Sequence, residues 1–186
     1  MNAWIESTFA NVIKMGWDTS YGWKIAIEST IYMTFWSFVF GGLLGLLAGL
    51  LLVLTGPRGV LENKYVFWIL DKVASLFRAI PFIILLAVIS PVTKLIVGKS
   101  IGMTAALVPL SLSVFPFYAR QVQVVLSEMD RGVIEAAQAS GATIWDIIRV
   151  YLREGLPDLM RVTTITLISL IGYTAMAGAI GSGGLG

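Results

Sequence analysis

Two stretches of the sequence contain glycines in spacings that can bind the phosphates of a nucleotide. Residues 181–186, GSGGLG, satisfy the pattern G-x-G-x-x-G, which binds a dinucleotide only between a strand and a helix of a βαβ unit. Gly98-Lys99-Ser100 matches the end of a phosphate-binding loop, but Thr93 stands where that loop requires its first glycine. The first stretch follows an apolar segment long enough to cross a membrane, and the second lacks a glycine. We therefore expect neither stretch to bind a nucleotide.

The composition removes most other candidate chemistry. The chain has no Cys and no His, so it offers no disulfide, no thiolate nucleophile and none of the usual histidine metal ligands or proton shuttles. The net charge of +2 is too small to indicate nucleic-acid binding, and the Lys and Arg residues do not form one basic run. We expect no catalytic residue, no metal, no cofactor and no nucleic-acid partner.

The densest group of charges lies in residues 120–161, which contain five Arg and six acidic residues. So many charges exclude burial of this interval in lipid. Local signals predict two short helices within it, at about 130–140 and at 143–153. Between them, Gly141 supplies the left-handed residue that ends the first helix.

The second of these helices has a defined start and one apolar face. Thr143, followed three residues later by Asp146, fits a capping box. The apolar residues follow the spacing i, i+3, i+4, i+7: Ile144, Ile147, Ile148 and Tyr151. This face either lies on the membrane surface or the protein's own spans, or docks into a groove of a partner. Four such side chains, each contributing about 1.5–3 kcal/mol gross on burial, suffice for docking before the ordering terms are subtracted.

The remainder of the chain is suited to a membrane. Of its residues 57% are hydrophobic and 13% are charged, against about 45–50% and about 25% in a soluble domain. A helix needs about 20 apolar residues to cross the hydrocarbon, and four stretches qualify: 29–57, 79–97, 100–119 and 162–186. The second qualifies only if Arg78 lies at one interface and Lys94 snorkels to the other. We expect an all-α, polytopic helical membrane protein.

Lys and Arg are distributed unequally between the predicted loops. One side holds nine (Arg58, Lys64, Lys72, Arg78, Arg120, Arg131, Arg149, Arg153 and Arg161) and the other holds four (Lys14, Lys24, Lys94 and Lys99). Short loops rich in Lys and Arg remain in the cytoplasm. We therefore expect a multi-pass protein of the plasma membrane with its N-terminus outside and residues 120–161 in the cytoplasm. The last span then runs outward, so either the protein ends outside or a further span follows Gly186.

The first 28 residues lack the pattern of a removable signal peptide. We expect residues 1–28 to be an extracellular or interfacial segment, separate from the membrane domain at 29–186. An interfacial helix there would place these residues on its apolar side: Trp4, Ile5, Phe9, Val12 and Ile13.

Three further regions of the predicted spans contain notable glycine or proline residues. Glycines recur at every fourth position, at Gly41, Gly45 and Gly49. They leave a groove that admits another helix, from the same chain or from a second copy. Gly178 and Gly181 either line a pathway or end the last span, because non-helical backbone at membrane depth needs cover by protein or a water-filled cavity. Arg78 is expected to anchor the second span at the cytoplasmic surface. A gating role beside Pro81 is the alternative.

The charged interval resembles a known signature. Glu135, Ala136, Ala137 and Gly141, spaced E-A-A-x-x-x-G, resemble the EAA loop of permease subunits of ABC importers. Nine residues after this glycine, the family pattern continues with an apolar residue, any residue and then Leu-Pro. Here residues 151–154 read YLRE, and a Leu-Pro occurs later, at 156–157. Three stretches are similar in order and spacing to the methionine-type importer permeases: FRAIPFIILL at 77–86, VGKSIGMTAALVPL at 97–110 and GYTAMAGAIGSGGLG at 172–186.

This resemblance covers about residues 29–186 and implies the type I ABC importer permease fold, with five spans. It implies uptake of methionine or a related amino acid by a permease homodimer in membrane lipid, with two copies of a cytoplasmic ATPase and an extracellular substrate-binding protein. The chain itself is then not an enzyme. The apolar face of 143–153 docks the ATPase, and Glu135 and Gly141 fix the angle between the two short helices.

Three other functions stay open on the sequence alone. An ion-coupled secondary amino-acid transporter needs ionisable groups near the bilayer midplane, and the predicted spans have none there. A permease of an ABC importer for another small polar solute fits the same motifs. A membrane scaffold without transport activity would use the charged interval only to recruit a partner.

Overall fold

The computed structural model describes residue 16 and residues 22–185. These residues form helices without any strand, in the order α3 (Trp23–Thr55), α4 (Lys64–Ala79), α5 (Phe82–Val97), α6 (Met103–Ser127), α7 (Arg131–Ala139), α8 (Ile144–Glu154), α9 (Leu156–Ala177) and a π-helical turn, η1 (Gly178–Ser182). The predicted all-α class is confirmed. The apolar residues of the predicted interfacial helix in 1–28 lie outside the described residues.

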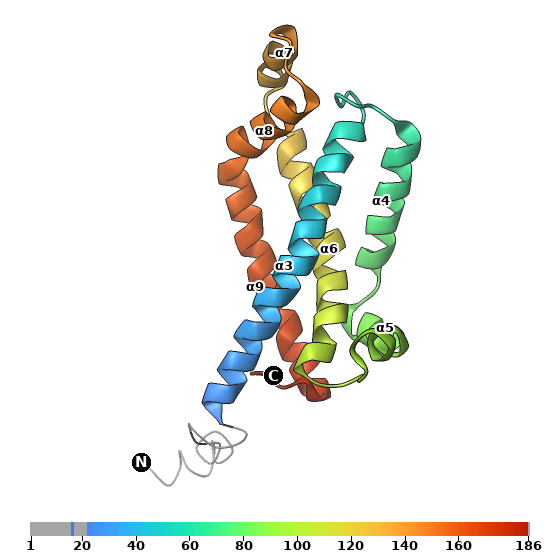
Figure 1. The fold of residues 1–186 in the computed structure, drawn as a ribbon, viewed down its shortest axis with the longest axis vertical. Coiled ribbons are helices and arrows are strands. Elements are labelled where there is room, and N and C mark those ends of the chain that lie inside the picture. Colours follow the sequence, from blue (N-terminus) through green and yellow to red (C-terminus); the bar gives the residue numbers. More distant parts are fainter. Residues whose placement is uncertain (1–15, 17–21, 186) are drawn as a thin grey trace.

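The long helices form an elongated bundle (Figure 1). In it, α3 and α6 run in one direction, α4 and α9 run in the other, and α7 and α8 lie at the end where α4 begins. By length and apolar composition, two helices in the described part can cross a membrane, Trp23–Thr55 and Leu156–Ser182, and the bent pair α4 and α5 would make a third. α6 packs against all four of these helices, so many of its residues are buried by protein rather than exposed to lipid.

The groove of glycines on α3 is filled by α6 of the same chain. A Cβ added at Gly41 would lie 2.5 Å from the carbonyl oxygen of Ser111, and one added at Gly49 would lie 2.6 Å from Cβ of Val122. Gly45 faces the backbone of Phe115 in the same way, at 2.9 Å. The interpretation of this groove as intramolecular packing, rather than a homodimer contact, is confirmed.

The prediction of a span at 79–97 is wrong. α4 ends at Ala79 and α5 begins at Phe82, and the two helices meet at an angle of 108°. Proline has no backbone N–H and disfavours helical geometry in the residue before it, and Ile80, before Pro81, is extended with φ −85° and ψ 119°. The segment that enters the bundle beside α3 and α6 is α4, and α5 lies across the bundle at its far end (Figure 1).

The helix in the last apolar segment ends at Ser182. α9 begins at Leu156, six residues before the predicted span, and passes into η1 after Ala177. Gly181, with φ +95°, breaks the helical geometry. The chain then turns back onto α3, where the amide of Leu185 donates to Oγ1 of Thr30 at 3.1 Å. Helix termination is therefore the role that the structure shows for Gly181.

Candidate functional site

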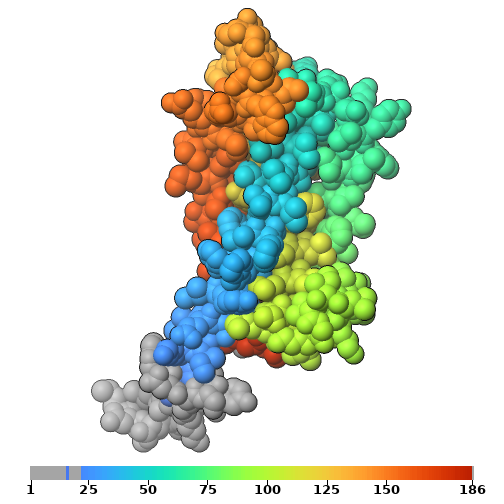
Figure 2. All heavy atoms as spheres, viewed as in Figure 1, coloured from blue at the N-terminus to red at the C-terminus, as the bar shows by residue number. Residues whose placement is uncertain are grey.

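The charged interval folds into a helix pair, α7 and α8, that projects from one end of the bundle (Figure 2). Both helices occur where the sequence predicts them. The carboxylate of Asp130 caps α7 by accepting from the amide of Gly132 at 2.8 Å. Gly141 adopts the predicted left-handed conformation, with φ +79°. The amide of Ala142 donates to the carbonyl of Ala137 at 3.1 Å and so completes the turn.

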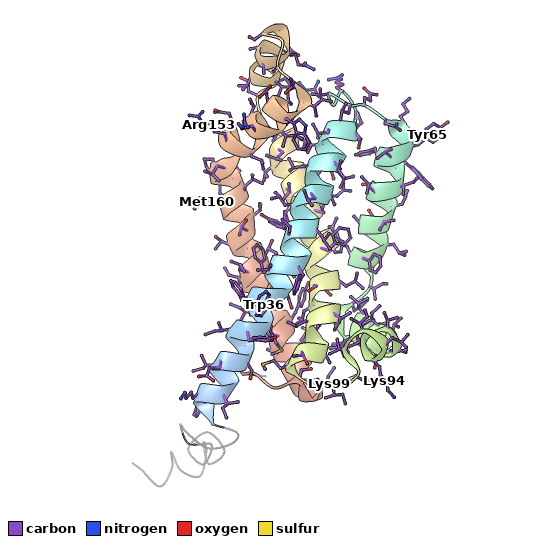
Figure 3. All side chains as sticks on the ribbon, viewed as in Figure 1. Trp36, Tyr65, Lys94, Lys99, Arg153 and Met160 are labelled. Atoms are coloured by element: carbon purple, nitrogen blue, oxygen red, sulfur yellow. The ribbon has the colours of Figure 1, made fainter. Side chains whose placement is uncertain are left out.

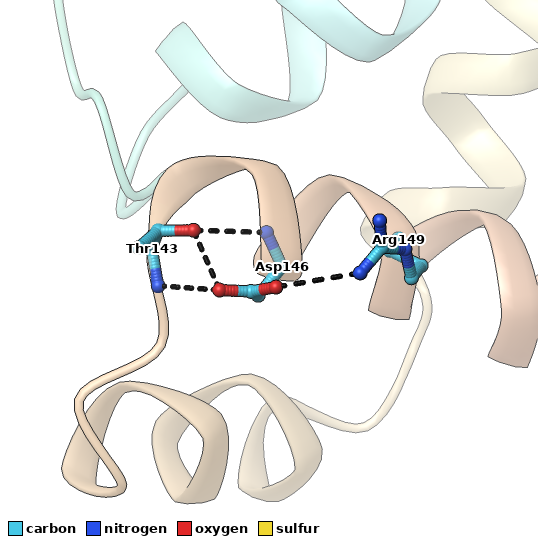
Figure 4. Close-up of polar contacts among 3 residues, drawn as sticks. All are labelled: Thr143, Asp146 and Arg149. Carbon is cyan, nitrogen blue, oxygen red and sulfur yellow. Dashed lines mark hydrogen bonds and ion pairs between the residues drawn. The ribbon is translucent and has the colours of Figure 1, made fainter.

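The start of α8 is fixed by the predicted capping box (Figure 4). The hydroxyl of Thr143 donates to Oδ2 of Asp146 at 2.5 Å, and the amide of Thr143 donates to the same oxygen at 3.0 Å. In return, the amide of Asp146 donates to the Thr143 hydroxyl at 3.4 Å. Arg149 lies 3.5 Å from Oδ1 of Asp146 and adds an ion pair one turn along. These bonds satisfy amides that a helix start otherwise leaves unpaired.

The capping box should make the stability of α8 depend on pH. The Thr143 hydroxyl and amide, followed by the charge of Arg149, hold the pKa of the Asp146 carboxyl below its ordinary value of 3.8. A carboxyl with a lowered folded pKa stabilises the fold above its unfolded pKa, and this contribution disappears as the pH falls through the folded pKa. We expect the hydrogen-exchange protection of α8 amides to decline below about pH 4. Asp146→Asn should reduce protection at neutral pH and remove this pH dependence, and an unchanged profile in that variant would contradict the assignment.

The apolar face of α8 is divided between two environments. Ile147 and Tyr151 are 2% and 7% exposed and pack into the chain's own core, which includes Leu126 of α6. Ile148 is partly buried against the same core. Ile144 remains 43% exposed. The prediction that the whole face docks a partner is thus corrected for Ile147 and Tyr151, because their surfaces are already occupied within the chain.

The most exposed apolar side chain of α8 is that of Trp145, which the sequence analysis did not single out. Its side chain is 77% exposed, next to the exposed Ile144. Helical periodicity placed Trp145 off the apolar face, so the spacing rule passed over it. The residue type was the available signal for a docking surface. A Trp on the polar side of a helix is rare, and Trp is enriched among the residues that contribute most to protein–protein binding.

Glu135 lines a polar cavity between α7 and the α3–α4 connection. The cavity has a volume of about 260 Å³ and includes Arg58, Arg131, Gln138 and Tyr151 in its walls. Burial raises the pKa of the Tyr151 phenol above its ordinary value, so that side chain stays neutral here. Glu135 therefore shares this cavity with the basic residues Arg58 and Arg131.

The small residues of the E-A-A-x-x-x-G motif serve the turn between α7 and α8. The carbonyl of Ala136 accepts the amide of Ser140 at 3.0 Å, and Ala136 itself is exposed. No atom lies within 4 Å of a Cβ added at Gly141. The turn therefore needs Gly141 for its backbone conformation and not for lack of space.

A substitution at Gly141 should act through backbone strain alone. Gly141→Ala should lower the free energy of unfolding by about 1–2 kcal/mol, because left-handed φ is unfavourable for a residue with a Cβ. Gly141→Asn should lose about half as much, since Asn tolerates this conformation. Thermal denaturation in detergent measures both. Equal losses for the two variants would contradict the strain argument.

The second group of predicted site residues lies deeper in the bundle, around the α4–α5 break. A cavity of about 260 Å³, here called the Arg78 cavity, is lined by Phe77, Arg78, Ile80, Phe82, Ser113, Phe117 and Tyr173. At a rise of 1.5 Å per residue, Ser113 lies about 15 Å from the start of α6 and about 21 Å from its end. Arg78 is therefore near the middle of the bundle. This position at the end of α4 is away from both ends of the bundle, whereas the expectation of an anchor assumed that a span begins at residue 79.

The structure separates the four residues of the predicted pathway. Arg78 and Pro81 both lie at the α4–α5 break. Gly178 and Gly181 belong to η1, near the start of α6, where a Cβ on Gly181 would lie 3.4 Å from Ile101. They line none of the walls of the Arg78 cavity.

The bundle, its bent second crossing and the projecting helix pair define a multi-pass membrane protein of the importer-permease class. Residues 41–186 match the family described as "binding-protein-dependent transport system inner membrane component", and the chain belongs to this family.

Its relatives include the D-methionine transport system permease protein MetI of Escherichia coli (strain K12), which is 49% identical over 153 residues, 82% of this chain and 70% of the relative. The probable D-methionine transport system permease protein MetI of Pasteurella multocida is 48% identical over 158 residues, 84% of this chain and 73% of the relative. A solved structure of inward-facing MetNI methionine ABC transporter has a TM-score of 0.84 at 47% identity, covering 86% of this chain and 74% of that chain.

Proposed function

We propose that this chain is the permease subunit of an ATP-driven importer of methionine. The observation that carries this function is the capped helix α8, which projects from the bundle with an exposed Trp145 and continues almost directly into α9. Such a helix can receive force from a cytoplasmic partner and pass it to the membrane helices. Relatives at 48–49% identity are named for D-methionine transport, which supports the substrate class.

The working assembly combines two copies of this permease with two copies of an ATPase and an extracellular binding protein. ATP hydrolysis belongs to the ATPase subunit. We propose that Ile144 and Trp145 of α8 insert into a groove of that subunit, since they are the exposed apolar side chains at its start. Ile147, Ile148 and Tyr151 hold α8 on the bundle, and Glu135, Ala136, Ala137 and Gly141 set the angle of α7 to it.

The distribution of charges supports one direction of insertion. Lys94 and Lys99 lie at one end of the molecule and Arg153 lies toward the other, near α7 and α8 (Figure 3). Positively charged short segments favour the cytoplasm, which supports an N-terminal segment, 1–28, outside and residues 120–161 inside. The membrane domain begins near residue 29. The backbone break at Pro81, near the middle of the bundle, borders the pathway in this proposal, because irregular backbone at this depth needs a protein or aqueous neighbour.

Reconstitution tests this function. Proteoliposomes that contain the chain, its cognate ATPase and its binding protein should take up labelled methionine only with ATP and with the binding protein present. Vesicles without ATP but with a proton or sodium gradient are the control. Uptake driven by the gradient alone would identify a secondary transporter, and uptake of a different solute with ATP would correct the substrate.

A further inference from the structure

We propose that the Arg78 cavity binds the carboxylate of the transported amino acid, with the Arg78 guanidinium as its counter-ion. This inference rests on the proposed function as an amino-acid importer and adds a binding group at a defined place. The cavity's volume of about 260 Å³ is slightly below the range for drug-sized ligand sites, about 300–1,000 Å³, and suits a small amino acid.

Three helices bring polar groups to this cavity. Arg78 comes from the end of α4, Ser113 from the middle of α6 and Tyr173 from α9. None of the three side chains makes a hydrogen bond or ion pair with another residue in the described part of the chain. Three unpartnered polar groups that converge on one cavity leave room for a ligand that pairs with them.

Arg78 has a particular need for an anion. Its side chain is exposed within the single chain, near the middle of the bundle. A guanidinium at this depth faces a water-filled space, a ligand or a counter-charge, because lipid disfavours it strongly. The other arginine of the bundle interior is neutralised within the chain, since Arg120 of α6 lies 3.0 Å from Asp71 of α4. Among residues 16 and 22–185, Arg78 has no such acidic partner.

The chemistry of the walls fits an amphipathic carboxylate. A guanidinium presents two parallel N–H donors that match the two oxygens of a carboxylate, and the hydroxyls of Ser113 and Tyr173 supply further donors. The other walls are the rings of Phe77, Phe82 and Phe117 and the side chain of Ile80, and aromatic rings accept a thioether sulfur favourably. No acidic residue of the described part of the chain lines the cavity, so no carboxylate there pairs with the ammonium.

One ring contact keeps this arrangement in place. Tyr173 stacks on Phe82 with ring centroids 5.0 Å apart and an angle of 22° between the planes. This contact joins α9 to the first residue of α5 directly after the Pro81 break. A shift of α9 would therefore move the Tyr173 hydroxyl relative to Arg78, so the affinity of the site changes with the conformation of the bundle.

Direct binding tests the inference. The detergent-solubilised complex of permease and ATPase, without the binding protein, should bind labelled methionine saturably at millimolar concentrations in equilibrium dialysis. Arg78→Gln should weaken this binding by roughly tenfold or more, because hydrogen bonds to charged groups are among the strongest in proteins. Arg78→Lys should retain part of the affinity. Arg161→Gln, which removes an exposed arginine paired with Asp158, should bind as the wild type does.

Two analogues separate a carboxylate site from an unspecific effect. 4-(Methylthio)butanoate, which keeps the carboxylate and lacks the ammonium, should displace methionine, whereas 3-(methylthio)propylamine, which lacks the carboxylate, should not. No saturable binding by the wild-type complex, equal competition by both analogues, or unchanged binding in an intact Arg78→Gln complex would each overturn the inference. If wild-type vesicles also fail to import any amino acid with ATP, the proposed function fails. If they import methionine normally, only the carboxylate site fails.

Discussion

The Gly41→Ala variant should lose about 1–3 kcal/mol of its free energy of unfolding, the typical cost of forcing an extra carbon into a packed contact. The three atoms nearest to the added Cβ all belong to the backbone of Ser111, at 2.5, 3.0 and 3.1 Å. A flexible side chain could move aside, but backbone inside a helix cannot do so without separating α3 from α6. The yield of monodisperse protein and the midpoint of thermal denaturation in detergent measure the loss.

Gly172→Ala is the matched control for this prediction. Gly172 also lies within a helix, α9, but no atom lies within 4 Å of a Cβ added there. Alanine favours helix over glycine by about 1 kcal/mol, so this variant should be as stable as the wild type or slightly more stable. Equal behaviour of the two variants would show that close contact between α3 and α6 does not determine stability.

Trp145→Asp should separate the permease from its ATPase without unfolding it. The Trp145 side chain is 77% exposed, so the chain loses little of its own packing. Burial of a Trp at a protein interface commonly contributes at least about 2 kcal/mol, or about 30-fold in the dissociation constant. Co-purification of a tagged ATPase and ATP-dependent methionine uptake should both fall, while the elution volume of the permease remains unchanged.

Two comparison variants separate docking from folding. Tyr65→Asp changes another exposed aromatic residue, on α4 at the same end of the molecule (Figure 3), and should leave ATPase binding intact. Ile147→Ala should lower stability by about 2–5 kcal/mol, because it leaves a cavity in the core. Full retention of the ATPase by Trp145→Asp would show that a different surface docks it.

The helices of the charged interval were predictable because their signals are local. Asp130, Thr143 with Asp146, and Gly141 each define a helix end through atoms within five residues of one another. No distant part of the chain is needed to form these bonds. Sequence reasoning therefore gave both helix ranges within about two residues, including the left-handed turn between them.

The second crossing was not predictable by the same means. α4 carries Asp71 among its apolar residues, and a rule based on uncharged length passes over such a segment. The structure shows the compensation, because Arg120 of α6 neutralises Asp71 at 3.0 Å. That pairing depends on a residue 49 positions away in the sequence, which no window along the chain can reveal.

The use of the apolar face of α8 also depended on tertiary structure. Periodicity correctly grouped Ile144, Ile147 and Tyr151 on one side of the helix. It could not state what covers that side, and the bundle's own core covers Ile147 and Tyr151. The free surface at Trp145 is what remains once the chain has folded.

Gly155 alone separates α8 from α9. Its amide donates to the carbonyl of Tyr151 at 3.0 Å, and its own carbonyl accepts the amide of Leu159 at 2.9 Å, so hydrogen bonds continue across the joint. A Cβ on Gly155 would collide with Leu126 near the end of α6. A one-residue connection with these hydrogen bonds and contacts resists bending. A displacement of α8 should therefore be transmitted to both α9 and α6 with little loss. A longer linker at this point would uncouple the ATPase from the membrane helices.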